Sequence, residues 1–403
     1  MPDDRNSALP LTLDRLLEPF SFPAFYDAWY EKKPLLIKRR SPAFYASLLT
    51  IDDLNAHIGQ AHLAAPPIRL ARDGEEVDRT DYTYPSSSPN RHWSDATVDK
   101  ELLFAKFYEG YTIVLMEYER HSAAMLRLRH DLERAFHSSV MTYVYVTPRN
   151  AQGFSPHWDP TDVFILQFAG TKDWMIYDSP VTLPTTDQLL YPGEWTRVEP
   201  TLTATLEPGD LLYVPRGFVH EARSGNAVSG HVTVELRTAT WADLLRQMAG
   251  DATADPWLRR PLPIDYRSVA SNDEFLRHVH EFFDHADLPA HIRRVHEDFA
   301  RDRVPDATDR LADYVKMPLV GAGSRLRVRS VVCHGLSNGG AKTVLRFDRK
   351  TLEFPASAAR SIRFMMNARE FTMSALPGSR SANLALCGTL VREGFLTVAG
   401  SPA

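Results

Sequence analysis

Cysteine is scarce in this chain of 403 residues, because only Cys333 and Cys387 are present. Two cysteines so far apart in the sequence cannot form the paired CxxC motifs of a zinc site or the dense cross-links of a small secreted domain. Such usage is typical of a protein that works in a reducing compartment, so we expect a cytoplasmic location.

Long apolar runs are also missing. No run approaches the roughly 20 residues that a membrane-spanning helix needs, so we expect no membrane segment. The N-terminal stretch MPDDRNSALPLTLDRLLEP opens with acidic residues and lacks the basic and apolar regions of a signal peptide, so we expect none. There is no internal repeat and no low-complexity tract. At roughly 100–200 residues per domain, the length predicts two or three globular domains.

The local patterns change along the chain. Residues 12–60 are predicted to be helical from apolar side chains at helical spacing, and EKKPLLIKR ends that pattern at Pro34 and starts a short strand. Residues 122–136 predict a second helix, with Ser122 as its N-cap. Short strands separated by turns follow: VMTYVYVTP, DVFILQFAG, KDWMIYD, ATLEPGDLLYVPRG, HEARS and SGHVTVELRTA. Strands at this spacing favour a β-sandwich or barrel, and the pattern from Trp241 to about Val315 is again helical.

A histidine and an aspartate stand two residues apart in GFSPHWDPTDVFILQFAGTKDWMIY. In a strand, residues i and i+2 share a face, so His157 and Asp159 are predicted to project together. The stretch EPGDLLYVPRGFVHEA supplies His220 from a later strand. Two histidines and one carboxylate form the facial triad of non-haem Fe(II) oxygenases, which leaves coordination positions open. A lone HxD is weak evidence, but together with the second motif it predicts a metal site.

Open positions on such an iron site imply a chelating co-substrate, commonly 2-oxoglutarate, whose distal carboxylate needs a buried cation. Lys172, in GTKDW, is the candidate, because a turn at Gly170 would bring its strand back beside the strand of His157. A buried ammonium without an anionic partner is unfavourable, so an anion would account for this lysine. The alternative, a surface lysine at a turn, stays open.

These motifs resemble a known family. YVYVTPRNAQGFSPHWDPTDVFILQFAGTKDWMIY, GDLLYVPRGFVHEA and SGHVTVEL are similar to the JmjC ribosomal oxygenases of the cupin superfamily. FYDAWYEKKPLLIKR is similar to the N-terminal signature of that family. FPASAARSIRFMMNAREFTMSALPG and LCGTLVREGFLTV are similar to its C-terminal winged-helix module. The resemblance extends over nearly the whole chain.

The resemblance implies a mainly β core, a double-stranded β-helix of the cupin or JmjC jelly-roll type, with helices around it. It implies a catalytic domain over 1–240, a helical dimerisation domain over 241–313 and a winged helix over 314–403. It also implies a homodimer that uses Fe(II), 2-oxoglutarate and O2 to hydroxylate a side chain, histidine in the members with lysine at this position, of a ribosomal protein or peptide.

The resemblance also assigns individual residues. The iron ligands would be His157, Asp159 and His220, and Lys172 would bind the co-substrate. Tyr145 and Ser229 match substrate-contacting positions, whereas Tyr143 stands where histidyl members have asparagine. We expect His231 and Thr233 in the barrel interior, and Trp174 and Tyr177 in the core rather than at the cofactor.

Charge is distributed unevenly. From Tyr314 onward, thirteen lysines and arginines face four acids, a net +9, which leaves −14 on the remainder of a chain with a net charge of −5. An anionic partner such as RNA or an acidic leader peptide could account for this, and so could a solvated basic face that docks on the acidic half of its own chain or its dimer mate. Besides hydroxylation of a ribosomal protein, three other functions stay open. They are a tailoring hydroxylase of a peptide natural-product precursor, an N-methyl demethylase, and a non-catalytic nucleic-acid-binding regulator.

Overall fold

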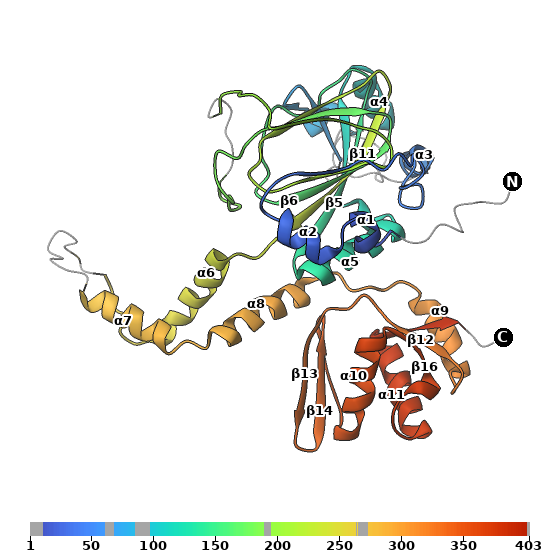
Figure 1. Cartoon of the computed structure of the whole chain (residues 1–403), viewed down its shortest axis with the longest axis vertical. Coiled ribbons are helices and arrows are strands. Elements are labelled where there is room, and N and C mark those ends of the chain that lie inside the picture. Colours follow the sequence, from blue (N-terminus) through green and yellow to red (C-terminus); the bar gives the residue numbers. More distant parts are fainter. Residues whose placement is uncertain are drawn as a thin grey trace. The chain divides into compact units, whose positions relative to one another are not determined.

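The structure is a computed structural model, and it describes residues 11–60, 68–84, 97–188, 195–262, 264 and 273–400. The chain divides into two compact units, residues 1–238 and 239–403 (Figure 1). No helix within the described ranges is long and apolar enough to cross a membrane. The finer division at residues 240 and 313 stays a prediction.

The first unit is built mainly from strands. Its helices are α1 (Leu13–Leu17), α2 (Phe22–Ala28), α3 (Ile51–Gln60), α4 (Lys100–Tyr108) and α5 (Ala123–Phe136). Its strands are β1 (Leu35–Ile37), β2 (Ile68–Arg72), β3 (Glu75–Glu76), β4 (Thr112–Met116), β5 (Ser139–Thr147), β6 (Asp162–Ala169), β7 (Lys172–Ile176), β8 (Leu202–Leu206), β9 (Leu211–Val214), β10 (His220–Ser224) and β11 (Ser229–Arg237).

Two antiparallel sheets face each other in this unit. The larger has the order β1-β9-β6-β11-β5-β4-β2-β3, and the smaller has the order β10-β7-β8. Between them lies an apolar cluster to which β6 contributes Val163 and Ile165, β7 contributes Trp174 and Ile176, and β8 contributes Leu206. Such a sandwich of sequence-distant strands is the expected jelly-roll core.

Strand β6 is buried on both faces, which explains why its sequence is a continuous apolar run rather than an alternation. Val163 and Ile165 point into the space between the sheets. Phe164 and Leu166 point the other way, into a cluster with Phe25 of α2 and other helical side chains. At roughly 25 cal/mol per Å² of buried apolar surface, this double burial makes β6 a main source of stability.

Helices α1, α2 and α5 cover the outer face of the large sheet (Figure 1). The prediction for α5 is confirmed: Ser122 is the N-cap, and its hydroxyl accepts a hydrogen bond from the Met125 amide at 3.3 Å. Met125, Leu128 and Leu132 are buried at helical spacing on the face toward the sheet.

The turn at Gly170 was expected to bring the next strand back beside the segment of His157, but β10 lies between them: β7 pairs with β10, and His157 pairs with His220 on the other edge of β10. Both edges of β6 are already hydrogen-bonded, to β9 and β11, so the next strand cannot pair with it. The chain crosses into the smaller sheet instead, where β7 pairs with β10 and β8. Gly170 has a φ of +57°, and a Cβ there would approach the Val228 carbonyl oxygen to 2.1 Å, so this crossing requires glycine.

The second unit contains the remaining elements. Its helices are α6 (Trp241–Asp251), α7 (Asp273–Asp284), α8 (Leu288–Asp302), α9 (Arg310–Lys316), α10 (Ala359–Ala368) and α11 (Arg380–Glu393). Its strands are β12 (Arg325–Val328), β13 (Cys333–Gly339), β14 (Lys342–Phe347), β15 (Lys350–Pro355), β16 (Glu370–Thr372) and β17 (Leu396–Gly400). The sheet β16-β12-β17 packs with α10 and α11 around Leu326, Ile362, Leu390 and Phe395.

Candidate metal and co-substrate site

His157 and His220 lie opposite each other on two chain segments that pair at a single point. The His157 amide donates to the His220 carbonyl at 3.1 Å, and the His220 amide donates to the His157 carbonyl at 2.8 Å. The HxD segment is therefore an isolated bridge rather than the strand that the sequence predicted. Asp159 is fixed by its own carbonyl, which accepts a hydrogen bond from the Gly217 amide at 3.0 Å.

The two imidazoles are oriented by backbone carbonyls. Nδ1 of His157 lies 2.8 Å from the Ser155 oxygen, and Nδ1 of His220 lies 3.1 Å from the Phe218 oxygen. Because a carbonyl can only accept, each Nδ1 carries the proton and each Nε2 presents a lone pair. Burial, and then the neighbouring His157, lower the pKa of His220, which favours the neutral form that metals bind.

The three predicted ligands converge. One ligand atom from each of His157, Asp159 and His220 lies within 4.8 Å of the other two. Nε2 of His220 is 3.6 Å from an Asp159 carboxylate oxygen, and the two ring centroids are 4.5 Å apart. No other group of three such side chains is found in the described part of the chain. The arrangement suits one divalent ion with open coordination positions.

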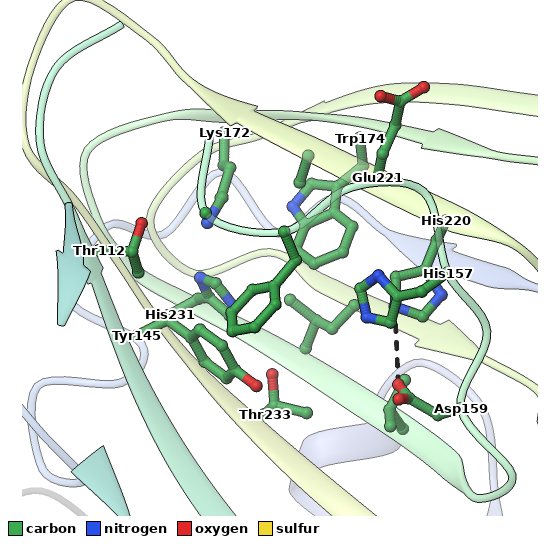
Figure 2. A pocket seen from close by; sticks show the side chains of 15 residues that line it. Thr112, Tyr145, His157, Asp159, Lys172, Trp174, His220, Glu221, His231 and Thr233 are labelled. Carbon is green, nitrogen blue, oxygen red and sulfur yellow. Dashed lines mark ion pairs between the residues drawn. The ribbon is translucent and has the colours of Figure 1, made fainter. Parts of the chain in front are cut away.

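A pocket extends from these ligands to Lys172 (Figure 2). The side chain of Lys172 comes from the first residue of β7 and is 4 % exposed. Its Nζ lies 3.1 Å from the Thr147 hydroxyl, and no carboxylate pairs with it among the described residues. Burial lowers the pKa of Lys172 to about 7. The Trp174 ring, 5.9 Å from Nζ, is a second neutral neighbour. A buried cation with only neutral partners at the end of a pocket is suited to an anionic ligand.

Two further polar groups in the pocket have no hydrogen-bond partner among the described residues: Nδ1 of His231 and Nε1 of Trp174. The His231 ring stacks on Tyr145 at 4.7 Å between centroids, and Trp174 meets His231 edge-on at 5.5 Å. Trp174 is in the core as expected, and it also lines the pocket. Tyr177 is in the core as expected, and its hydroxyl donates to Glu221 at 2.6 Å.

The two predicted substrate contacts lie in different surroundings. Tyr145 lines the pocket, beside His231 (Figure 2). Ser229 is fully buried and does not line it, and its hydroxyl accepts from the Gln167 amide at 2.9 Å. The roles of both residues in substrate binding stay predictions.

Sequence reasoning missed part of the pocket wall. Thr147 is the last residue of β5, and its hydroxyl lies beside Lys172. Thr112, the first residue of β4, and Phe154, three residues before His157, line the pocket. The register of β5 against β11, which pairs Thr147 with Ser229 and Tyr145 with His231, places these residues along one interior row. In the sequence, this row of interior side chains is indicated only by the alternation of polar and apolar residues in SGHVTVEL.

Comparison with known proteins identifies the family. Residues 115–244 match the JmjC domain model. Ribosomal oxygenase 2 of Bos taurus is 30% identical over 350 residues, which cover 79% of this chain and 71% of that protein. The chain belongs to the JmjC-domain ribosomal oxygenase family. The bifunctional lysine-specific demethylase and histidyl-hydroxylase NO66 of Aedes aegypti is 28% identical over 319 residues, or 74% of this chain and 46% of that protein. The chain thus spans less than half the length of that relative.

Solved structures show the same fold. The crystal structure of the ribosomal oxygenase YcfD of Escherichia coli superimposes with a TM-score of 0.56 at 15% identity, covering 94% of this chain and 98% of that one. A second structure of YcfD, in complex with cobalt and 2-oxoglutarate, gives a TM-score of 0.52 at 16% identity. This chain thus shares with YcfD a JmjC-type β core with surrounding helices.

Proposed function

We propose that this ribosomal oxygenase family member hydroxylates a side chain, histidine first among the candidates, in a ribosomal protein or peptide, using Fe(II) and 2-oxoglutarate. The observation that supports it best is the convergence of His157, Asp159 and His220 at one end of a pocket that has an unpaired buried lysine at the other. The names of the bovine and insect relatives support the reaction and the substrate class.

The residues present fit both the metal and the co-substrate. Two neutral imidazoles and one carboxylate would bind Fe(II) and leave positions for a chelating ligand. Lys172 would bind the distal carboxylate of 2-oxoglutarate, with the Thr147 hydroxyl beside it. The free Nε1–H of Trp174 could donate to the same ligand. With O2, iron and 2-oxoglutarate supply the oxidation that inserts one oxygen atom into an unactivated C–H bond.

The protein contributes orientation and exclusion of water. Backbone carbonyls fix the tautomer of both histidine ligands, and the stacked Tyr145 and His231 rings close one wall of the pocket. Trp174 and Ile165 line the apolar side. A dry, shaped cavity protects a reactive oxidant from side reactions.

The proposal is tested by incubating the purified protein with Fe(II), 2-oxoglutarate, O2 and a panel of ribosomal-protein peptides. We expect one peptide to gain the mass of one oxygen atom, with succinate formed in equal amount. A tailoring enzyme would instead modify a precursor peptide encoded beside its gene, so precursor peptides belong in the same panel. Loss of a methyl group would identify a demethylase, and binding of RNA without any succinate would support a non-catalytic regulator.

A homodimer is proposed from helices α6 and α7. Helix α7 is strongly amphipathic over 12 residues, yet none of its residues is buried. Its apolar side includes Phe275, 51% exposed, and Phe283, 40% exposed, and α6 exposes Trp241 and Leu245 one turn apart. Large apolar side chains left uncovered on neighbouring helices are typical of a subunit interface.

Replacing Phe275 and Phe283 with aspartate is expected to convert the dimer to a monomer, because two charges would be desolvated at the interface. Light scattering coupled to size-exclusion chromatography measures the mass. Tyr108→Asp, at an 86% exposed position on α4, is the matched control and should leave the mass unchanged. A monomeric wild-type protein would refute the dimer.

The basic C-terminal region is proposed to bind RNA through the predicted winged helix. Arg325, Lys342 and Lys350 are paired with acids. Arg360 and Arg363 are exposed on α10 one turn apart, and no ion pair involves them within the described chain. Exposed arginines without an acidic partner are available to bind phosphate groups of RNA.

Arg360→Ala with Arg363→Ala is therefore expected to weaken binding to a short RNA and to reduce the salt slope by about one per lost phosphate contact. Fluorescence anisotropy from low to moderate salt measures both. Lys342→Ala, which removes a cation already paired at 2.6 Å with Glu353, is the control and should leave the slope nearly unchanged. RNA binding that does not depend on salt would exclude phosphate contacts by Arg360 and Arg363.

A cytoplasmic location is also proposed, and it rests on cysteine usage alone.

A further inference from the structure

A second pair of histidines meets in the first unit. His57 lies in the last turn of α3, and His121 directly follows the short 3-10 helix Tyr118–Arg120 that comes after β4. Their ring centroids are 4.8 Å apart, with an angle of 49° between the ring planes. The metal ligands His157 and His220 have corresponding values of 4.5 Å and 53°. The two pairs therefore have nearly the same mutual geometry.

This geometry is the one that two imidazoles adopt around a single ion. Zinc lies about 2.0–2.1 Å from a coordinating imidazole nitrogen, which places the ion about 3.2 Å from the ring centroid. Two such rings have centroids about 4.5 Å apart when they meet at a right angle, and about 5.2 Å apart at the tetrahedral angle. The 4.8 Å between His57 and His121 lies within this interval.

Both imidazoles are available for coordination. Within the described residues, no hydrogen bond or ion pair holds a ring nitrogen of His57 or His121. Each ring can therefore turn about its side-chain torsions and aim one nitrogen at a common point. Burial, and then His121, lower the pKa of His57, which keeps its imidazole in the neutral form that binds metals.

A carboxylate lies beside the pair. Asp53 precedes His57 by one turn of α3, so the two side chains share a face of the helix, and both line an open cavity with His121. The Asp53 carboxylate accepts hydrogen bonds from the Thr50 amide at 2.9 Å and from the Thr50 hydroxyl at 2.6 Å. The three side chains do not bring their ligand atoms within 4.8 Å of one another, so Asp53 would reach an ion through a bound water.

We propose that His57 and His121 bind a zinc ion, with a water between the ion and Asp53, and that this ion joins α3 to the segment between β4 and α5. The site is independent of the proposed oxygenase reaction, since its cavity shares no lining residue with the pocket of Lys172. Imidazole ligands suit zinc, whereas manganese prefers oxygen ligands. An ion held by two separate segments stabilises the folded chain, because the pair of ligands is dispersed on unfolding.

Zinc and manganese distinguish this site from the one in the pocket. The purified metal-free protein is dialysed against micromolar Zn²⁺ or Mn²⁺, and the bound metal per chain is measured by plasma mass spectrometry. We expect two zinc ions but only one manganese ion per chain, because the histidine pair lacks the direct carboxylate ligand that the pocket supplies through Asp159.

His57→Ala and His121→Ala are each expected to remove one zinc ion per chain and to leave manganese binding unchanged. Asp53→Asn should weaken zinc binding about 10-fold, the lower end of the effect of partners that contact a metal indirectly. Asp52→Asn, the exposed acid next to Asp53 on α3, is the control for the change of charge, and His280→Ala, an exposed histidine on α7, is the control for binding by lone histidines. Both controls should keep two zinc ions.

The two metal sites can fail separately. Because His121 is exposed, its replacement should leave the thermal midpoint of the metal-free protein unchanged, so loss of zinc there is not a loss of folding. Equal zinc content in the wild-type protein and in His121→Ala would overturn the histidine site, and so would loss of a zinc ion in His280→Ala. Absence of manganese binding would instead count against the metal site of the pocket, and the difference in zinc content between wild type and His121→Ala would be unaffected.

Discussion

Replacing Asp159 with alanine is expected to abolish substrate-coupled succinate formation and to weaken divalent-metal binding at least 100-fold. The carboxylate is the only anionic ligand of the three, and without it two neutral imidazoles would have to hold the ion alone. His157→Ala should have the same effect, because it removes one of the three ligands, while the backbone pairing with His220 is kept. Mn²⁺ binding, followed by electron paramagnetic resonance, measures the affinity directly, and succinate is measured by mass spectrometry.

Asp173→Asn is the matched control for Asp159. Its carboxylate is exposed on β7, next to Lys172 in the sequence, and accepts a hydrogen bond from Thr205 at 2.5 Å. It lies outside the pocket, so metal binding and succinate formation should stay near the wild-type values. Full activity in Asp159→Ala or in His157→Ala would contradict the assignment of the metal site.

The sequence predicted the metal ligands because their chemistry is local and their motifs are specific. His157 and Asp159 are two residues apart, and His220 follows a recognisable turn-strand-turn segment. The strands of the core were also predictable, since VMTYVYVTP and DVFILQFAG correspond to β5 and β6. Likewise, the N-cap at Ser122 depends only on neighbouring residues.

The remainder of the site depends on strand order, which no local pattern determines. The turn at Gly170 was predicted to bring Lys172 back beside the His157 segment, but hydrogen bonding on both edges of β6 sends β7 into the other sheet, where β10 separates it from His157. That crossing is what places Lys172 and Trp174 opposite β5 and β11, where Thr147 and His231 lie. Trp174 was assigned to the core because a tryptophan in a strand usually packs there, and its free Nε1 becomes apparent only in three dimensions.

Lys172 links ligand binding to stability. Without an anion, its ammonium is buried among neutral groups, the Thr147 hydroxyl and the Trp174 ring, and burial lowers its pKa from 10.5 to about 7. The charged form is therefore tolerated better in the unfolded chain. Between pH 7 and pH 10.5 the unfolded state binds more protons than the folded one, so this residue makes the free energy of unfolding increase as pH rises. Below about pH 7, where the lysine is charged in both states, its destabilising effect on the folded protein is largest.

Lys172→Met, of similar length and uncharged, is accordingly expected to stabilise the ligand-free protein at pH 7 by on the order of 2–4 kcal/mol, allowing for relaxation around the buried charge. The gain over wild type should shrink as pH rises towards 10.5. Thermal unfolding of the metal-free protein across this pH range measures it. Lys106→Met on α4, where the lysine is partly exposed and paired with Glu109 at 3.2 Å, is the control and should show no such gain.

Lys172→Met should weaken the binding of 2-oxoglutarate, although it stabilises the ligand-free protein. Loss of the buried partner for the distal carboxylate is expected to weaken 2-oxoglutarate binding about 100-fold, because one charge of a buried pair is then left alone. In the wild-type protein the affinity should fall as pH rises above 7, since a neutral lysine must first take up a proton, and in Lys172→Met this dependence should disappear. A variant that gains stability but keeps its 2-oxoglutarate affinity would place the co-substrate's carboxylate elsewhere. A variant that loses both stability and 2-oxoglutarate affinity would show that Lys172 has a structural role. A lysine whose function is to bind an anion destabilises the ligand-free protein and stabilises the complex with 2-oxoglutarate.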